Sequence, residues 1–157
     1  MASPVGPSSG CAWHADCPKL AREFGATDIV AERGEDAVEA IKQTTGGVDA
    51  TLECVGTGQA MHTAIDIALA GSMIGFVGVP HGVELPIGHM FSRTVGVHGG
   101  GAPVRVYLPE LLEDVLAERI NPGRVLDYGT DLDGIGEAHA ATDERRAIKS
   151  RVRVGTV

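Results

Sequence analysis

The sequence predicts an α/β protein built around a parallel β-sheet. Two apolar segments, residues 48–55 and 72–79, have the length and composition of strands that are buried on both faces. Each ends in a glycine-containing turn, and a segment with helical spacing lies between them. Because parallel neighbours need crossover helices, this alternation favours a sheet that is covered by helices on both faces.

Five segments are predicted to be helical from their apolar spacing and their ends. Residues 15–25 form the first, and Gly25 is placed to end it in the left-handed conformation. Glu35 and Asp36 open a second helix that continues to Gly46, because acidic side chains stabilise the positive end of the helix dipole. The other helix candidates are residues 59–70, residues 108–120 with Pro109 near the first turn, and residues 132–143.

Shorter strand candidates complete the alternation. Residues 28–31 form an apolar run before the second helix, and residues 94–98 repeat the pattern of a strand followed by glycines. Residues 80–93 are expected to form a long connection with one extended piece at 83–86. The last strand candidates are residues 125–128 and 150–154.

Composition and charge exclude several classes of function. The chain has 157 residues, of which 43% are hydrophobic and 22% charged, as in a soluble globular domain. Its 13 Lys and Arg against 21 Asp and Glu give a net charge of −8, which repels nucleic acids and anionic lipids. No apolar run approaches the ~20 residues of a membrane span, and the first residues lack the pattern of a secretory signal. We therefore expect no nucleic-acid or membrane partner and a cytoplasmic location.

The three cysteines predict no disulfide framework. Cys11, His14 and Cys17 have a spacing that could present two thiolates and an imidazole to zinc. Against this, their segment is rich in Pro, Gly and Ser, no second cluster follows, and Cys54 lies in a predicted buried strand. Free thiols are the favoured interpretation, and no residue is assigned as a metal ligand.

Five segments of the chain carry a family resemblance. They are LAREFGATDIV (20–30), GGVDATLECVGT (46–57), GSMIGFVGVP (71–80), RTVGVHGGG (93–101) and RAIKSRVRV (146–154). In this order they resemble the C-terminal portion of the medium-chain zinc-dependent alcohol dehydrogenases, also called zinc-binding dehydrogenases. The resemblance implies a doubly wound, Rossmann-like sheet of order 3-2-1-4-5-6 that binds its ligand at the carboxyl ends of the strands.

The resemblance also implies nucleotide contacts at three strand ends and at one lysine. The residues are Val55, Gly56, Val77, Gly78, Val79, Val97, His98, Gly99 and Lys149. By position, Val55 and Gly56 would flank the adenosine, and Val77, Gly78 and Val79 would meet the nicotinamide ring. Val97, His98 and Gly99 would bind the carboxamide of that ring, and Lys149 would contact the pyrophosphate. Without the resemblance, the glycines are turn residues, the histidine is a partly buried ring, and the lysine is solvated.

Two parts of the family's architecture have no counterpart in these residues. The first strand with its GxGxxG turn is absent, so we expect NAD or NADP to bind weakly or not at all, and the sequence does not distinguish the two. Zinc is expected only in the full family architecture, and no catalytic residue is assigned. In the family's order strand 1 lies beside residues 48–55, which we therefore expect to have an unpaired apolar edge that allows self-association.

The resemblance divides the chain into three parts. Residues 1–13 are expected to be a disordered lead, because residues 1–10 are rich in Pro, Gly and Ser and hold little apolar area. Residues 14–120 are expected to form a partial dinucleotide-binding domain. Residues 121–157 are expected to be a return segment that packs on the family's catalytic domain and leaves Val125, Leu126 and Ile135 exposed in this chain.

The function implied by the resemblance is hydride transfer between a small-molecule alcohol and NAD(P), which yields an aldehyde or ketone. This chain alone is expected to be inactive, because zinc ligands and phosphate loop would have to come from a separate polypeptide. The alternative is a non-catalytic remnant that serves at most as a weak nucleotide-binding or association module. A different parallel-sheet enzyme, such as a methyltransferase, ranks last.

Overall fold

The computed structural model describes residues 16–155, which form two compact units. The first unit comprises residues 25–102, and the second comprises residues 16–24 and 103–155. The predicted disordered lead, together with Cys11 and His14, lies outside the described residues.

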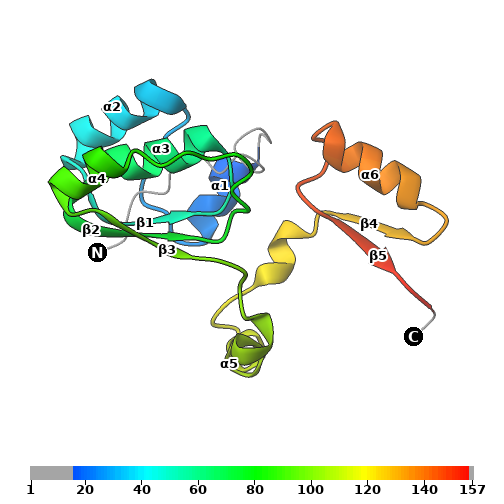
Figure 1. Cartoon of the computed structure of the whole chain (residues 1–157). Coiled ribbons are helices and arrows are strands. Elements are labelled where there is room, and N and C mark those ends of the chain that lie inside the picture. Colours follow the sequence, from blue (N-terminus) through cyan, green and yellow to red (C-terminus); the bar gives the residue numbers. More distant parts are fainter. Residues whose placement is uncertain (1–15, 156–157) are drawn as a thin grey trace. The chain divides into compact units, whose positions relative to one another are not determined.

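A three-stranded parallel sheet forms the centre of the first unit. Its strands are β1 (Val48–Glu53), β2 (Ala68–Phe76) and β3 (Gly96–Gly99), in the order β1-β2-β3 (Figure 1). Glu53 pairs with Phe76, and Phe76 pairs with Gly99, so the three strands end level with one another. The predicted α/β class with a parallel sheet is therefore confirmed.

Three helices lie on the same side of this sheet in Figure 1: α2 (Gly34–Thr45), α3 (Gly58–Ile67) and α4 (Ile87–Arg93). Helix α3 contacts β1 and β2, and α2 packs against α3. Helix α2 ends at Gly46, whose φ of 75° is the left-handed conformation that terminates helices. Helix α3 begins directly after the turn that follows β1, and the Thr57 hydroxyl caps it by accepting a hydrogen bond from the Ala60 amide at 3.2 Å.

The core of this unit lies between α3, α4 and the sheet. Ile65 of α3 and Ile74 of β2 are both 0% exposed, and Met61, Ala64, Met90 and Val95 surround them. Burial of each large aliphatic side chain contributes about 1.5–3 kcal/mol. The smooth helix face that the sequence predicts for residues 59–70 is this core-facing side of α3 as far as Ile67, but residues 68–70 belong to β2, so the predicted helix is three residues too long.

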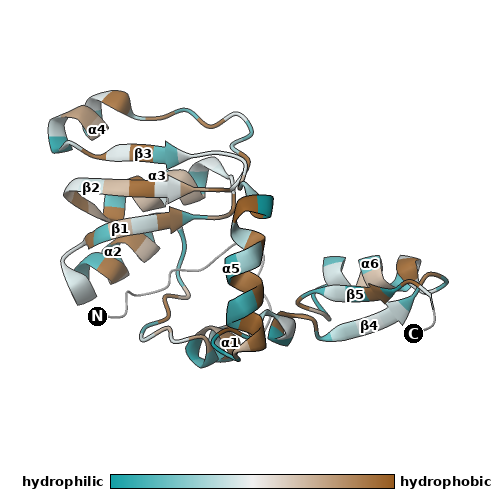
Figure 2. Ribbon diagram, turned by 90° about the horizontal axis from the view of Figure 1, so that it is seen from below, coloured by the Kyte–Doolittle hydropathy of each residue, from teal (hydrophilic) through white to brown (hydrophobic). Residues whose placement is uncertain are grey.

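The opposite face of the sheet carries large apolar side chains that are exposed. Leu52 of β1 is 83% exposed and Met73 of β2 is 54% exposed. Figure 2 views the three strands from below, with α3 behind them. Within residues 16–155 the sheet gives β1 only one strand neighbour, β2. The expectation that these strands are buried on both faces is therefore wrong for the described residues, because only the face toward α3 and α4 is covered.

The second unit contains a βαβ element near the C-terminus. Strands β4 (Tyr128–Asp131) and β5 (Ser150–Arg153) are parallel, and helix α6 (Ile135–Asp143) connects them and packs on both. The same unit holds α1 (Cys17–Glu23), α5 (Val104–Leu116) and the 3-10 helix η1 (Pro122–Val125). Arg124 of η1 binds the Glu23 carboxylate of α1 at 2.6 Å, which ties these two elements together.

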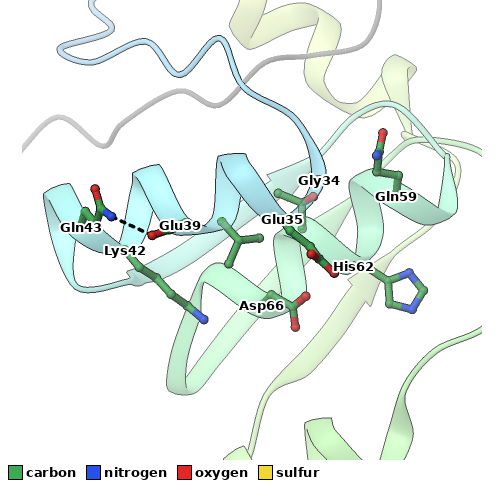
Figure 3. Close-up of a pocket in the computed structure, with 10 residues that line it drawn as sticks. Gly34, Glu35, Glu39, Lys42, Gln43, Gln59, His62 and Asp66 are labelled. Atoms are coloured by element: carbon green, nitrogen blue, oxygen red, sulfur yellow. Dashed lines mark hydrogen bonds between the residues drawn. The ribbon is translucent and has the colours of Figure 1, made fainter.

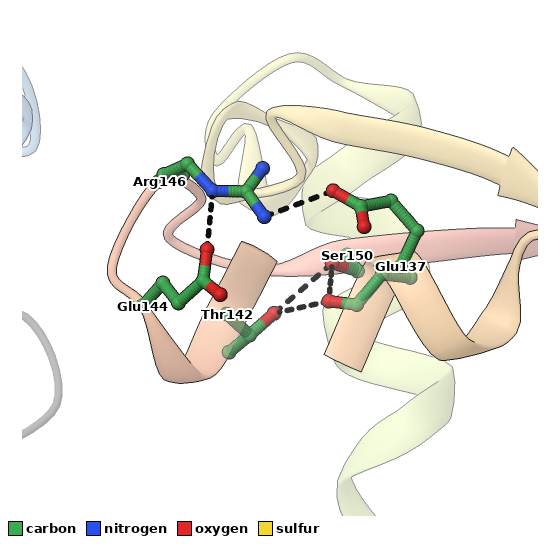
Figure 4. A network of polar contacts seen from close by, with 6 residues as sticks. Glu137, Thr142, Glu144, Arg146 and Ser150 are labelled. Atoms are coloured by element: carbon green, nitrogen blue, oxygen red, sulfur yellow. Dashed lines mark hydrogen bonds and ion pairs between the residues drawn. The ribbon is translucent and has the colours of Figure 1, made fainter. Parts of the chain in front are cut away.

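Polar contacts close the turn between α6 and β5 (Figure 4). The Arg146 guanidinium binds Glu137 at 2.9 Å and Glu144 at 2.7 Å. The hydrogen bond to Glu144, and to a smaller extent the one to Glu137, raises the pKa of Arg146. The hydroxyls of Thr142 and Ser150 both donate to the Ala138 carbonyl, each at 3.0 Å. These bonds fix the end of α6 beside the start of β5.

The structure corrects several predicted elements. Residues 28–31 do not form a strand, since only Ile29 makes an isolated bridge. Residues 80–93 are not one long connection, because α4 occupies their second half. Helix α5 begins at Val104 rather than at residue 108, so that Pro109 lies inside the helix. Residues 122–125 form a 3-10 turn, and the strand predicted at 125–128 begins only at Tyr128.

Among residues 16–155, no helix combines the length and the apolar character that crossing a membrane requires.

Leu126 and Ile135 are 38% and 36% exposed, as expected, whereas Val125 is half-buried.

Candidate functional site

The carboxyl ends of the three parallel strands form the candidate site. Eight of the nine residues predicted to contact a nucleotide lie at this edge, after β1, after β2 or within β3. The carboxyl edge of a parallel sheet is where open α/β folds bind ligands. Lys149 belongs to the other unit, where it is exposed and its amide donates to Asp127 Oδ1 at 3.2 Å.

Glycine packing holds these strand ends together. A Cβ at Gly56 would collide with the carbonyl oxygen of Val79 and lie 2.7 Å from its nitrogen. A Cβ at Gly78 would lie 2.7 Å from the Val55 carbonyl carbon, and one at Gly99 would lie 2.8 Å from that of Phe76. These positions require glycine because backbone from a neighbouring strand end fills the space.

Glu53, the last residue of β1, was missed in the sequence-based assignment of the site. Its side chain is buried, and its Oε1 accepts hydrogen bonds from the Val55 amide at 2.7 Å and the Gly56 amide at 2.8 Å. The available signal was an acidic residue at the end of an otherwise apolar strand. That signal alone does not show that the carboxylate folds back under the following turn.

The side chains at this edge are largely apolar. Val77 is 55% exposed and Val79 is 64% exposed, whereas Val97 packs against the core. His98 is exposed, so the alternative interpretation of a partly buried ring is wrong. Such an edge suits a flat ring that carries a polar amide. The ring can pack on the small apolar side chains, and the amide can form hydrogen bonds with the backbone groups.

A shallow pocket of about 960 Å³ lies elsewhere in the same unit, between α2 and α3 (Figure 3). Glu35, Glu39, Lys42, His62 and Asp66 contribute its charged or titratable lining. Its lining includes none of the nine predicted residues. Because it is open and lined by solvated side chains, we interpret it as a groove between two surface helices.

No metal-binding cluster of three or more His, Cys, Asp or Glu occurs within residues 16–155. Cys17 is disulfide-bonded, so the expectation of free thiols is wrong for this residue. Cys54 is a free thiol but is exposed rather than buried. The side chains described in the structure therefore do not fit a zinc ion.

The comparisons with known proteins agree with the geometry. The family model described as zinc-binding dehydrogenase matches residues 14–115. S-(hydroxymethyl)glutathione dehydrogenase from Photobacterium damsela subsp. piscicida is 28% identical over 84% of this chain and 38% of its own length. The same-named protein from Escherichia coli O1:K1 / APEC is also 28% identical, over 86% of this chain and 39% of its own length.

Solved structures share the fold. An alcohol dehydrogenase from Thermus sp. ATN1 superposes with a TM-score of 0.82 at 21% identity, over 98% of this chain and 45% of that chain. An alcohol dehydrogenase zinc-binding domain protein from Burkholderia ambifaria gives a TM-score of 0.80 at 21% identity, over 99% of this chain and 50% of that chain. The chain thus spans at most about half the length of these proteins.

The family match overlaps the whole of the β1-β2-β3 sheet and the glycine-lined edge. It leaves the methyltransferase alternative without support. Because the match covers more than half of the chain, the chain belongs to the zinc-binding dehydrogenase family.

Proposed function

We propose that this chain is the nucleotide-binding portion of an NAD(P)-dependent alcohol dehydrogenase. The single observation that carries the proposal is the level carboxyl edge of β1, β2 and β3, closed by turns that only glycine fits. This edge lies within the segment that matches the family. The S-(hydroxymethyl)glutathione dehydrogenases and alcohol dehydrogenases that it resembles support the same reaction class.

The geometry of the edge fits the nicotinamide half of a dinucleotide. Gly56 and Gly78 are buried in turns that touch each other, so this part of the edge is a smooth backbone surface. Val77 and Val79 project from it as exposed apolar side chains beside the proposed ring position. When bound, NAD(P) supplies the hydride acceptor or donor, and the chain's own residues bind and orient it.

Lys149 is proposed to meet the pyrophosphate as a point charge. The described residues hold no zinc ligand set, so no step of the reaction is assigned to zinc in this chain. The polarising metal and the phosphate-binding glycine loop would have to come from polypeptide outside these residues. Oxidation of an alcohol to an aldehyde or ketone is therefore proposed for the complete enzyme, with weak nucleotide binding for this chain alone.

Fluorescence titration of the purified chain with NADH and with NADPH tests the proposal. We expect weak, saturable binding of at least one of the two, with no turnover of an alcohol panel by the chain alone. Competition of the bound reduced dinucleotide by AMP, which has no reduced nicotinamide ring, separates recognition of the nicotinamide half from recognition of adenosine. Failure of both reduced dinucleotides to bind at millimolar concentration would refute the proposal.

A second candidate function is an association module, and the exposed β1 edge favours it. Leu52 lies on this edge strand and is 83% exposed. Unpaired strand edges with apolar side chains are templates for pairing with another chain. Size-exclusion chromatography with light scattering discriminates the two candidates, because the association module forms oligomers whether or not nucleotide is added.

A further inference from the structure

Glu53 occupies an unusual place for an acidic side chain. It is only 4% exposed and lies at the end of β1, next to the turn that the nucleotide is proposed to contact. Its Oε1 accepts two backbone hydrogen bonds, but its Oε2 is buried without a hydrogen-bond partner within the described residues. A buried polar atom without a partner destabilises a fold, so this arrangement calls for a reason other than stability.

The same residue also connects β1 to the turn after β2. The Glu53 carbonyl oxygen accepts hydrogen bonds from the Val77 amide at 2.9 Å and the Gly78 amide at 3.4 Å. Glu53 therefore binds four amides, two in each of the turns that are proposed to face the nucleotide. Side chain and backbone of one residue set the spacing between these turns.

The unpartnered oxygen has a steric consequence. A Cβ on residue 78 would lie only 2.6 Å from Glu53 Oε2. The carboxylate thus fills the space beside Gly78 from the interior, while the Gly56 backbone fills it from the adjacent turn. The turns leave no room for a side chain at residue 78, and the hydrogen bonds to Glu53 hold both turns in place, which is how a binding surface is organised before its ligand arrives.

We propose that Glu53 is the positioning residue of the nucleotide site, an inference that rests on the proposed function. Its carboxylate fixes the Val55–Gly56 turn, and its carbonyl fixes the Val77–Gly78 turn. The nucleotide then meets two ordered turns and loses less binding free energy to ordering them. Glu53 acts through these backbone groups and touches no substrate.

Three variants of the full chain test the proposal. Glu53→Ala removes the acceptor, and Glu53→Gln keeps a neutral acceptor oxygen at nearly the same place. Asp49→Asn is the matched control, since it neutralises an exposed carboxylate on the same strand. For each variant we would measure amide hydrogen exchange at Val55 and Gly56, the thermal unfolding midpoint, and the Kd for the reduced dinucleotide that the wild type binds.

The proposal predicts that Glu53→Ala speeds exchange at both amides by about tenfold or more, because each loses a charge-assisted hydrogen bond. The same variant should weaken dinucleotide binding by about tenfold. Glu53→Gln should restore both properties to within about threefold of wild type, and Asp49→Asn should change neither. If Glu53→Ala does not fold, Glu53→Asp replaces it, since the carboxylate is then one methylene too short to reach both amides.

The outcomes separate this inference from the proposed function. A wild type that binds no reduced dinucleotide overturns both. Wild-type binding with an unchanged Kd in Glu53→Ala and Glu53→Asp overturns the positioning role alone, even when exchange at Val55 and Gly56 accelerates. The positioning role is also contradicted if Glu53→Gln loses dinucleotide binding while the Val55 and Gly56 amides stay as protected from exchange as in the wild type. The hydrogen bonds to these amides would then not be enough to maintain the binding site.

Discussion

Replacing Gly78 by alanine tests whether the strand-end turns interlock as described. The new Cβ would lie 2.6 Å from Glu53 Oε2 and 2.7 Å from the Val55 carbonyl carbon, and it would also collide with the Gly56 nitrogen. Two of these three neighbours are backbone atoms, which cannot rotate away as the end of a flexible side chain can. The φ of Gly78 is not in the left-handed region, so the strain is purely steric.

The magnitude follows from two opposing effects. Overpacking of a well-filled interior costs about 1–3 kcal/mol, and rigid backbone neighbours place this site at the upper end of that range. Loss of unfolded-state entropy on replacing glycine by alanine returns about 0.4–1 kcal/mol. The net destabilisation is then about 2 kcal/mol, which lowers the Tm by roughly 4–8 °C for a chain of this size.

Circular dichroism melting of Gly78→Ala and Gly58→Ala provides the assay. Gly58 is the matched control: it begins α3 two residues after Gly56, its φ is not in the left-handed region, and a Cβ there meets no atom within 4 Å. We expect Gly58→Ala to melt at or slightly above the wild-type Tm. Equal melting temperatures for the two variants would refute the interlocking of the turns.

Three further substitutions test the packing, the charges and the sheet edge. Ile65→Ala should lower the free energy of unfolding by about 2–5 kcal/mol in urea titrations, because Ile65 is 0% exposed. Ile87→Ala, at a side chain that is 63% exposed, should change the free energy of unfolding by less than about 0.5 kcal/mol. Equal effects of the two substitutions would contradict the assigned core. The hydrogen bond from Arg124 lowers the pKa of Glu23. The stabilising effect of this pair is therefore present above the Glu23 pKa of the unfolded chain and is lost as the pH falls through the lowered pKa of the folded chain. Arg124→Ala should raise the Glu23 pKa in carboxyl NMR titrations, and an unchanged pKa would show that the pair does not persist in solution. Leu52→Glu should reduce concentration-dependent association in light scattering. A wild type that stays monomeric at high concentration would contradict self-association through the β1 edge.

The architecture of the first unit could be predicted because its elements carry strong local signals. The β1 and β2 segments are apolar runs that end at glycines, and the segment between them has the smooth apolar face of a packed helix. The end of α2 was equally clear, since Gly46 takes the left-handed conformation that the sequence suggests. In each case, local preference and tertiary packing favour the same structure.

Other elements could not be predicted because packing overrides the local signal. Helix α4 covers only seven residues, contains Gly88 and follows Pro86, so the sequence favours a loop, yet Met90 is buried in the core and holds the helix in place. Helix α5 continues through Pro109, which the sequence places near a helix start. The segment at residues 28–31 makes only an isolated bridge at Ile29, although four residues are enough for a ladder in β3, β4 and β5, so its apolar run alone does not decide the outcome.

The candidate site shows the same division. The strand-end residues could be assigned from the family resemblance, and the parallel register brings eight of them to one edge. Glu53 could not be assigned, because its role depends on a carboxylate that turns back to the Val55 and Gly56 amides. The requirement for glycine at position 78 likewise arises from contacts between two turns that lie far apart in the sequence.

The central claim is that the carboxyl edge of the β1-β2-β3 sheet is the nucleotide-binding surface of this chain. Amide NMR spectra recorded during a titration with NADH, and again with NADPH, test it most directly, because they locate even weak binding. We predict concentration-dependent shifts concentrated in the turns after β1 and β2 and at His98 and Gly99. Shifts confined to the groove between α2 and α3, or no shifts at millimolar dinucleotide, would contradict the account.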